Sequence, residues 1–167
     1  MAQFIGIIAF CLAVWSFQQN EHKKIVLLQL VANLCFALHF YLIGAYTGAL
    51  LNLIGAVRSV VFVCKDKKWA SSNWWLVFFS FICIAAGIYT WKNAASVLPI
   101  IAMVLTTVAF GIPNPKLTRL VAFPSSPLWL IYNVLSQSWG GVATEVFNML
   151  SILIGMLRFG RRKKVTK

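Results

Sequence analysis

The chain of 167 residues is 60% hydrophobic and only 11% charged, with 15 lysines and arginines against 3 acidic residues. A soluble domain carries about 25% charged residues, so this composition excludes an ordinary soluble protein and predicts an integral membrane protein. A chain of this length leaves no room for a separate soluble domain, so we expect one membrane domain over residues 1–167.

Seven apolar runs of the length that spans a bilayer follow one another along the chain. A transmembrane helix needs about 17–25 residues, and the runs cover residues 4–18, 25–43, 46–64, 73–91, 95–112, 117–136 and 139–158. Gly44 and the pair Gly140-Gly141 mark two tight turns between runs. The expected fold class is therefore an all-α integral membrane protein with seven transmembrane helices.

The basic residues are distributed unevenly over the connections. With the N-terminus outside, the outer connections hold Lys92 alone, and the inner connections with the tail hold thirteen basic residues: Lys23, Lys24, Lys65, Lys67, Lys68, Lys116, Arg119, Arg158, Arg161, Arg162, Lys163, Lys164 and Lys167. Cytoplasmic connections carry an excess of lysine and arginine, so the sequence predicts an outer N-terminus and a cytoplasmic C-terminus. The basic tail at 161–167 is then a topology signal that touches anionic lipid, and no nucleic-acid partner is expected.

The spacing of the chemically active residues favours neither an enzyme nor a metal protein. The four cysteines, Cys11, Cys35, Cys64 and Cys83, stand singly in apolar runs. Isolated cysteines of this kind behave as small buried hydrophobes. The sequence also has no phosphate-binding loop, nucleophile–base pair or cluster of metal ligands. We expect no catalytic residue, no cofactor and no metal.

The chain contains a weak internal repeat at a shift of 93 positions. This shift places Ile7-Ile8-Ala9 on Ile100-Ile101-Ala102, and it pairs Phe17 with Phe110, Lys23 with Lys116 and Gly48 with Gly141. The predicted plan is 3+1+3: a first triple-helix repeat at 1–68, a linker helix at 69–93, a second repeat at 94–160 and the tail. Parallel repeats of this kind occur in transporters, with the substrate between the halves.

Three motifs carry a family resemblance: IIAF at 7–10, YLIGAYTGALLN at 41–52 with Arg58 after it, and GGVATEVFNMLSILIGMLRF at 140–159. On these motifs the chain resembles the YgjV-type bacterial inner-membrane proteins over nearly its full length. The resemblance implies a location in the bacterial inner membrane and no particular activity. The 3+1+3 plan is similar to that of the SWEET sugar transporters and the PnuC-type vitamin transporters.

The prolines depart from the SWEET pattern, which places hinge prolines in the first two helices of both triplets. This chain has Pro99, Pro124 and Pro127 in the second triplet and none in the first. These three are the candidate gating or hinge residues, and any rocking is expected to be asymmetric.

Polar and aromatic residues share one face of the sixth predicted helix. Ser126, Trp129 and Asn133 are spaced three and four residues apart, so they lie on one side of a helix. The repeat-equivalent face in the second helix holds Asn33 and Phe36, with Gln29 as an uncertain member one turn earlier. If these faces meet, they form a cavity with aromatic walls and amide hydrogen-bonding groups, which suits a neutral, ring-bearing solute. The alternative is that the amides only pair across helices.

The seventh predicted helix contains Glu145, which is the only acidic residue in any span, and Asn148 follows on the same side. The repeat equivalent of Glu145 is Asn52. A charged carboxylate is costly in an apolar environment, so Glu145 is a candidate for proton coupling or for binding a ligand's polar groups. The alternative is a structural pair with His39, Arg58 or a buried amide.

His39 and Arg58 are two further ionisable residues within the spans. Arg58 is either an anchor whose long side chain reaches the inner interface or a substrate contact. His39 is either a packed, hydrogen-bonded histidine or a second proton-coupling candidate.

We therefore expect a transporter or facilitator of a small polar, neutral solute such as a sugar, nucleoside or vitamin. The alternative is a non-transporting inner-membrane protein that binds lipid or a partner protein. The expected partners are the solute and the lipid bilayer, and a homo-oligomer is compatible with the sequence.

Overall fold

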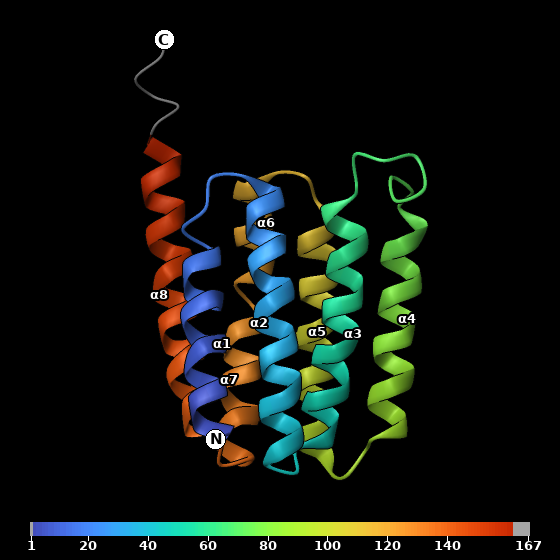
Figure 1. Ribbon diagram of the computed structural model, residues 1–167, viewed down its shortest axis with the longest axis vertical. Helices are drawn as coiled ribbons and strands as arrows, with labels where there is room; N and C mark the ends of the chain where they lie inside the picture. The colour runs from blue at the N-terminus through green and yellow to red at the C-terminus, as the bar shows by residue number, and fades with distance from the viewer. Residues whose placement is uncertain (1, 162–167) are drawn as a thin grey trace.

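The computed structural model describes the backbone of residues 2–161 and the side chains of residues 2–158. This part of the chain is a bundle of α-helices without strands (Figure 1). The elements in chain order are α1 (Ala2–Ser16), α2 (His22–Leu42), α3 (Tyr46–Val63), α4 (Trp74–Tyr89), the short 3₁₀ turn η1 (Ala94–Ser96), α5 (Val97–Gly111), α6 (Pro115–Ala122), α7 (Ser125–Leu135) and α8 (Trp139–Arg161). Apart from the backbone of Arg161, the predicted basic tail lies outside the described residues.

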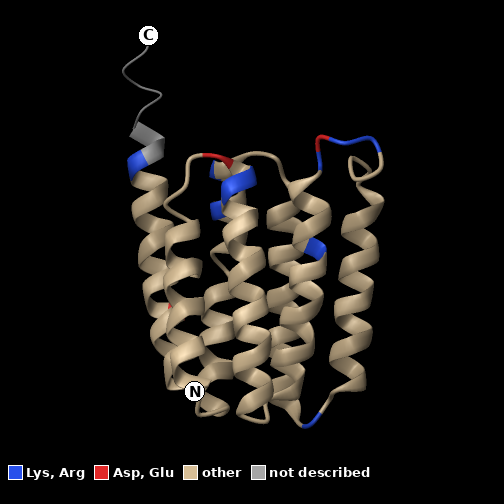
Figure 2. Ribbon diagram, in the orientation of Figure 1, with Lys and Arg blue, Asp and Glu red and all other residues tan. Residues whose placement is uncertain are grey.

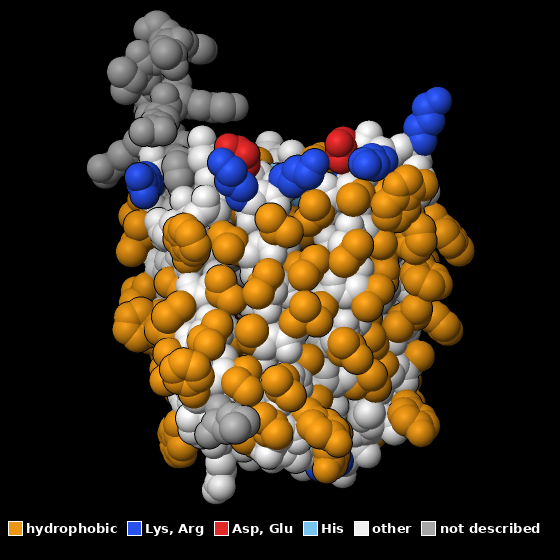
Figure 3. Space-filling model, in the orientation of Figure 1, with side chains coloured by type: hydrophobic (Ala, Val, Ile, Leu, Met, Phe, Trp, Pro, Cys, Tyr) orange, Lys and Arg blue, Asp and Glu red, His pale blue; other side chains and the backbone are white. Residues whose placement is uncertain are grey.

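Four segments of the described chain are long and apolar enough to cross a membrane: His22–Leu42, Tyr46–Val63, Ala94–Gly111 and Trp139–Arg158. Two further helices, Ala2–Ser16 and Trp74–Tyr89, are apolar but shorter. Figure 3 shows apolar side chains over the whole visible flank of the bundle, between a charged end and the opposite end. An exposed apolar surface of this extent favours contact with lipid over contact with water.

One predicted helix is wrong, because the span at 117–136 consists of two helices. α6 ends at Ala122, and α7 begins at Ser125. Pro124 stands at the break, and proline both lacks a backbone N–H and clashes with the carbonyl four residues earlier. The side chain of Asn114 caps the start of α6 by accepting hydrogen bonds from the backbone N–H groups of Lys116 and Leu117.

The helices form a closed ring in the order α1, α2, α3, α5, α7, α8, with α8 packed against α1. α4 lies outside this ring and packs mainly on α3 and α5. α6 continues the line of α7 toward the end of the bundle where α8 ends, and it packs on α5 and α8. Six helices therefore surround one central space.

The buried apolar side chains form two clusters along the axis of the ring. One contains Phe17, Phe62 and Phe110 near the end where α1, α3 and α5 finish. The other contains Phe40, Leu51 and Trp129 near the opposite end. The central space between them is therefore bounded by apolar side chains at both ends.

The two turns α2–α3 and α7–α8 have the same backbone hydrogen bonds. In the first, Ala45 N–H donates to the Phe40 carbonyl at 2.9 Å, and in the second, Ser138 N–H donates to the Asn133 carbonyl at 2.8 Å. Gln137 is the position 93 residues after Gly44. These two residues are the positions of the described chain with positive φ, 75° at Gly44 and 54° at Gln137. A left-handed residue is a common way to end a helix, and glycine adopts it without strain.

Most of the described charged residues gather at one end of the bundle (Figure 2), Arg58 and Glu145 are buried within it, and Lys92 donates to the Gly44 carbonyl at the α2–α3 turn. The two halves are tied together at the charged end. His22 Nε2 donates to the Phe110 carbonyl at 2.8 Å, and Arg119 Nε donates to the Phe17 carbonyl at 2.9 Å. Phe17 and Phe110 are 93 residues apart, so they are equivalent positions of the predicted repeat. The backbone carbonyl of each accepts a hydrogen bond from a basic side chain of the other half of the chain.

Candidate functional site

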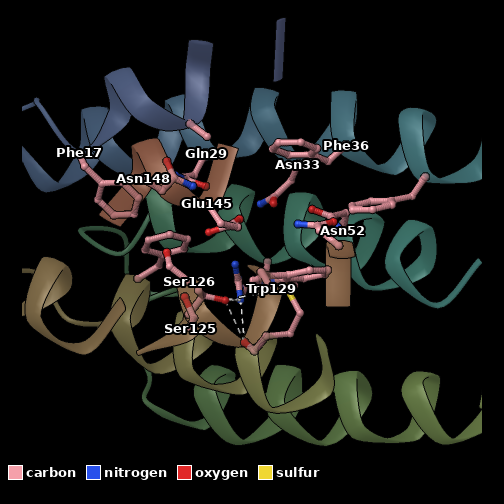
Figure 4. Close-up of a pocket in the computed structure, with 17 residues that line it drawn as sticks. Phe17, Gln29, Asn33, Phe36, Asn52, Ser125, Ser126, Trp129, Glu145 and Asn148 are labelled. Carbon is pink, nitrogen blue, oxygen red and sulfur yellow. Dashed lines mark hydrogen bonds between the residues drawn. The ribbon is translucent and has the colours of Figure 1, made fainter. Parts of the chain in front are cut away.

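A cavity of about 60 Å³ lies inside the ring of helices (Figure 4). Residues of α1, α2, α3, α5, α7 and α8 line it. Ten of the lining residues are those singled out from the sequence: Gln29, Asn33, Phe36, Asn52, Arg58, Ser126, Trp129, Asn133, Glu145 and Asn148. The structure therefore brings together residues that lie more than 100 positions apart in the chain.

Glu145 lies near the middle of the cavity and is 9% exposed. Figure 4 shows its carboxylate between the side chain of Asn148 on one side and those of Asn33 and Asn52 on the other. The neighbouring polar side chains that act on this carboxylate are those of Ser126 and Asn148. Asn148 is on the same helix, three residues later, and Ser126 is on α7, so α7 and α8 together orient the acid.

Arg58 is held from α5 and is 1% exposed. Its Nη1 donates to the Met103 carbonyl at 3.2 Å and to the Thr107 hydroxyl at 2.6 Å. The guanidinium also lies over the ring of Phe110, 5.2 Å from its centroid, which is a favourable position for a cation. The Arg58 side chain lies inside the bundle and not at the membrane interface, and its contacts with α5 fit a structural anchor as well as a substrate contact.

Four buried polar atoms have no hydrogen-bond partner among the described residues, and all four belong to side chains that line the cavity. They are Asn33 Nδ2, Arg58 Nε, Asn133 Oδ1 and Asn148 Oδ1. Buried polar groups are otherwise almost always paired, because an unpaired one costs about 1–3 kcal/mol. Two of these atoms are donors and two are acceptors, so the cavity presents both kinds of group to whatever occupies it.

Aromatic side chains cover the cavity toward the Lys92 end. Phe40 and Trp129 are stacked with centroids 6.0 Å apart, and Tyr132 meets Trp129 edge-on at 5.7 Å. The Tyr132 hydroxyl accepts from the Gly48 N–H at 3.3 Å. A second cavity of about 180 Å³ lies beyond, and Tyr132 and Lys92 are among the residues that line it. The aromatic side chains of Phe40, Trp129 and Tyr132 thus lie between the two cavities.

Comparison with known proteins identifies the family. A sequence model of the family described as "Imp-YgjV: Bacterial inner membrane protein" matches residues 1–163. The chain belongs to this family. It is 24% identical over 164 residues to inner membrane protein YgjV of Escherichia coli (strain K12), which covers 98% of this chain and 87% of the relative. No solved structure matches the chain.

The resemblance to the YgjV family seen in the sequence motifs is thus confirmed. Membership places the chain among bacterial inner membrane proteins, in agreement with the apolar helices of the bundle. The relative's description states a location and no activity.

His39 lies outside the cavity of this family member. Its Nδ1 is 3.1 Å from the Ala2 carbonyl, and its Nε2 is 3.2 Å from the Ser138 hydroxyl. A carbonyl only accepts hydrogen bonds, so Nδ1 donates to Ala2, while Nε2 forms a hydrogen bond with the Ser138 hydroxyl. The ring joins α2 to the start of α1 and to the α7–α8 turn, which is the geometry of the packed alternative.

The three candidate hinge prolines lie in α5 and around the α6–α7 break. Pro99 is buried in the first turn of α5, Pro124 stands between the two short helices, and Pro127 is in the first turn of α7. None of the three lines the cavity. Only Pro124 coincides with an interruption of a predicted helix.

Sequence reasoning missed most of what α1 and α5 contribute to the cavity. The lining residues not singled out as a site are Ala13, Phe17, Phe40, Met103, Thr106, Phe110 and Ser125. One signal was present: the pair Thr106-Thr107 places two hydroxyls in an otherwise apolar run, and both accept hydrogen bonds from Arg58.

Proposed function

We propose that this protein is a transporter or facilitator of a small polar, net neutral solute. In this proposal the cavity between two helix triplets is the binding site, and Glu145 couples proton movement to solute movement. The four unpaired polar atoms that line the cavity carry the proposal, because a purely structural core would pair them. A bound solute with both donors and acceptors would satisfy them.

The arrangement of the helices supports a 3+1+3 repeat with its two-fold axis through the cavity. A shift of 93 residues maps α1 on α5, α2 on α6–α7 and α3 on α8. It then maps the neighbours α1–α2 on α5–α7, α2–α3 on α7–α8, and α3–α5 on α8–α1, which are all observed neighbours. The matched turns at Gly44 and Gln137 support the same relation. α4 would be the linker helix.

The size of the cavity supports a closed state of this transporter. Pockets for drug-sized ligands measure about 300–1,000 Å³, whereas this cavity measures about 60 Å³. Apolar clusters bound it at both ends. A sugar, nucleoside or vitamin would require the halves to move apart, and a smaller solute would require less movement.

The test is the thermal stability of the purified protein in detergent with a panel of sugars, nucleosides, vitamins and amino acids. A solute at about 100 times its dissociation constant stabilises the folded state by about 2.7 kcal/mol. We expect a rise for one solute class in the wild type and none in Glu145→Gln or Asn133→Ala. Ser59→Ala is the matched control, because Ser59 is buried and bonded to the Gly55 carbonyl but does not line the cavity.

Uptake of the same solute into proteoliposomes distinguishes transport from simple binding. We expect a transmembrane proton gradient to change the rate of uptake by the wild type and to have no effect on Glu145→Gln. If no solute stabilises the protein and no flux is measured, the transport proposal is wrong. The lipid-binding or partner-binding alternative then remains.

A further inference from the structure

The cavity contains two ionisable side chains, Arg58 and Glu145, and they are not paired with each other. Among the described side chains, the ion pairs are Lys23–Asp66 and Lys24–Glu21, and both are at the exposed end. Arg58 and Glu145 are 1% and 9% exposed. A buried charge is normally compensated by an opposite charge, because leaving it alone is costly. Two uncompensated groups in one small cavity therefore need an explanation.

The two groups occupy positions where the halves differ. The position 93 residues after Arg58 holds Ser151, and the position 93 residues before Glu145 holds Asn52. Ser151 donates to the Val14 carbonyl, and Asn52 donates to the Gly48 carbonyl. Each ionisable group thus has a neutral, hydrogen-bonded equivalent, so the cavity has a basic side on α3 and an acidic side on α8.

The Arg58 guanidinium can bind an anionic group, and no described acidic side chain forms an ion pair with it. Nη1 donates to groups of α5, while Nε is buried without a hydrogen-bond partner, and the residue lines the cavity. Arginine remains protonated in proteins, and its planar guanidinium is well matched to a carboxylate. The contacts with Met103, Thr107 and the Phe110 ring fix the guanidinium, so little side-chain entropy would be lost on binding.

The Glu145 carboxylate can likewise bind a cationic hydrogen-bond donor. Its two neighbours, Ser126 and Asn148, are neutral, and no lysine, arginine or histidine forms an ion pair with it among the described residues. In the proposed repeat Ser151 is level with Arg58, so Glu145 lies about 9 Å nearer the Lys92 end at 1.5 Å per residue. A solute that contacts both groups has to bridge this separation together with the two side chains.

We propose that the solute is a small zwitterion, with a carboxylate that meets Arg58 and an ammonium group that meets Glu145. This inference rests on the proposed function, since it assigns the chemistry of the solute to the same cavity. A zwitterion compensates both buried groups at once and leaves the occupied cavity neutral. An anion or a cation of the same size compensates only one. Small amino acids such as alanine have this chemistry.

The experiment compares four small probes that differ in charge: L-alanine, L-alaninamide, N-acetyl-L-alanine and glycerol. Thermal stability and uptake into proteoliposomes are measured for the wild type. We expect stabilisation and uptake with alanine. Alaninamide, which lacks the carboxylate, and N-acetylalanine, which lacks the ammonium group, are each expected to bind at least about tenfold more weakly, because each loses a charge-assisted hydrogen bond.

Variants then test which residue binds the carboxylate of the solute and which binds its ammonium group. Arg58→Gln should remove the preference for alanine over alaninamide, and Arg58→Lys should restore part of it. Glu145→Gln should remove the preference over N-acetylalanine. Lys92→Gln, which removes a positive charge outside the central cavity, is the control and should keep both preferences. If Arg58→Gln does not fold, the wild-type comparison of the four probes still decides.

Two results would overturn the inference in different ways. If a sugar or nucleoside stabilises the protein and enters proteoliposomes while alanine does neither, the zwitterion is wrong and the transport function stands. The zwitterion is also wrong if N-acetylalanine or alaninamide binds as tightly as alanine. If nothing in either panel binds or is transported, the proposed function fails, and this inference fails with it.

Discussion

Gly141 lies where α8 approaches the Asn133 side chain most closely. A Cβ at this position would be 2.5 Å from both Cγ and Oδ1 of Asn133, well inside the contact distance of these atoms. Asn133 is 2% exposed, so its amide has little space to move except into the cavity. We predict that Gly141→Ala destabilises the protein by about 1–3 kcal/mol, as overpacking does, measured by thermal unfolding in detergent.

The neighbouring glycine is the control for this prediction. A Cβ at Gly140 would be 3.5 Å from its nearest neighbour, Gln3 Oε1, which is an ordinary contact. Because alanine favours helix over glycine by about 1 kcal/mol, Gly140→Ala should leave stability unchanged or raise it. Equal losses in both variants would mean that the start of α8 is sensitive in general, and the contact with Asn133 would not be the cause. Adding Asn133→Ala to Gly141→Ala should recover part of the loss.

Single residues of the cavity were predictable where their chemistry conflicts with an apolar span. Asn33, Asn133 and Glu145 stand out in the sequence because a polar group in hydrocarbon needs a partner or a cavity. Phe17, Met103 and Phe110 line the same cavity, yet an apolar residue in an apolar helix carries no such signal. The burial of Arg58 cannot be predicted from the sequence for a related reason. The direction of its side chain depends on contacts with α5, which lies far away in the chain.

At the scale of the element, the break between α6 and α7 is the feature that hydropathy did not detect. The run at 117–136 is apolar enough throughout to suggest one helix, whereas the break depends on one missing N–H at Pro124. Helix position, not hydrophobicity, determines the effect of a proline: Pro115 lies in the first turn of α6, where the N–H has no helical partner and proline is favourable.

Pro124→Ala is therefore predicted to join the two short helices. The alanine of this variant has a backbone N–H that can donate a hydrogen bond to the carbonyl of Leu120, four residues earlier, and this bond is worth about 1 kcal/mol net. Amide hydrogen exchange across residues 120–128 should slow by roughly fivefold, measured by mass spectrometry in detergent. If the break is the moving hinge of a transporter, solute flux should fall in the same variant.

Pro115→Ala is the matched variant for this measurement, since it removes a proline from the same helix pair without touching the break. It should leave both hydrogen exchange at 120–128 and flux unchanged. A Pro124→Ala protein with unaltered exchange would show that packing of α7 on α5 and α8, and not the proline, maintains the break.

For the whole molecule, the order of apolar and basic segments along the sequence predicted the helical class and the gathering of charge at one end. The turn predicted at Gly44 is observed, whereas the one predicted at Gly140-Gly141 is wrong, because α8 begins at Trp139 and both glycines lie inside it. The sequence did not reveal that Gln137 adopts the same left-handed conformation as Gly44, since a non-glycine residue there is held by the surrounding hydrogen bonds. The ring order of the helices depends on contacts between residues far apart in the chain, which no local pattern encodes.

The distribution of charge leads to a prediction for the molecule in its membrane. Apart from the buried Arg58, most described lysines and arginines gather at the end of the bundle where α8 ends (Figure 2), and Lys92 lies by the α2–α3 turn at the other end. The positive-inside rule then predicts that the loop with Lys65, Lys67 and Lys68 is in the cytoplasm and the loop with Lys92 is outside.

Cysteine labelling tests this topology in a variant whose four cysteines are replaced by alanine and which carries one new cysteine, from either Lys92→Cys or Lys68→Cys. In intact spheroplasts a membrane-impermeant maleimide should label the first variant and not the second, and both should be labelled after lysis. Labelling in the reverse order would invert the proposed topology, and it would place the aromatic layer of Phe40, Trp129 and Tyr132 toward the cytoplasm instead of the outside.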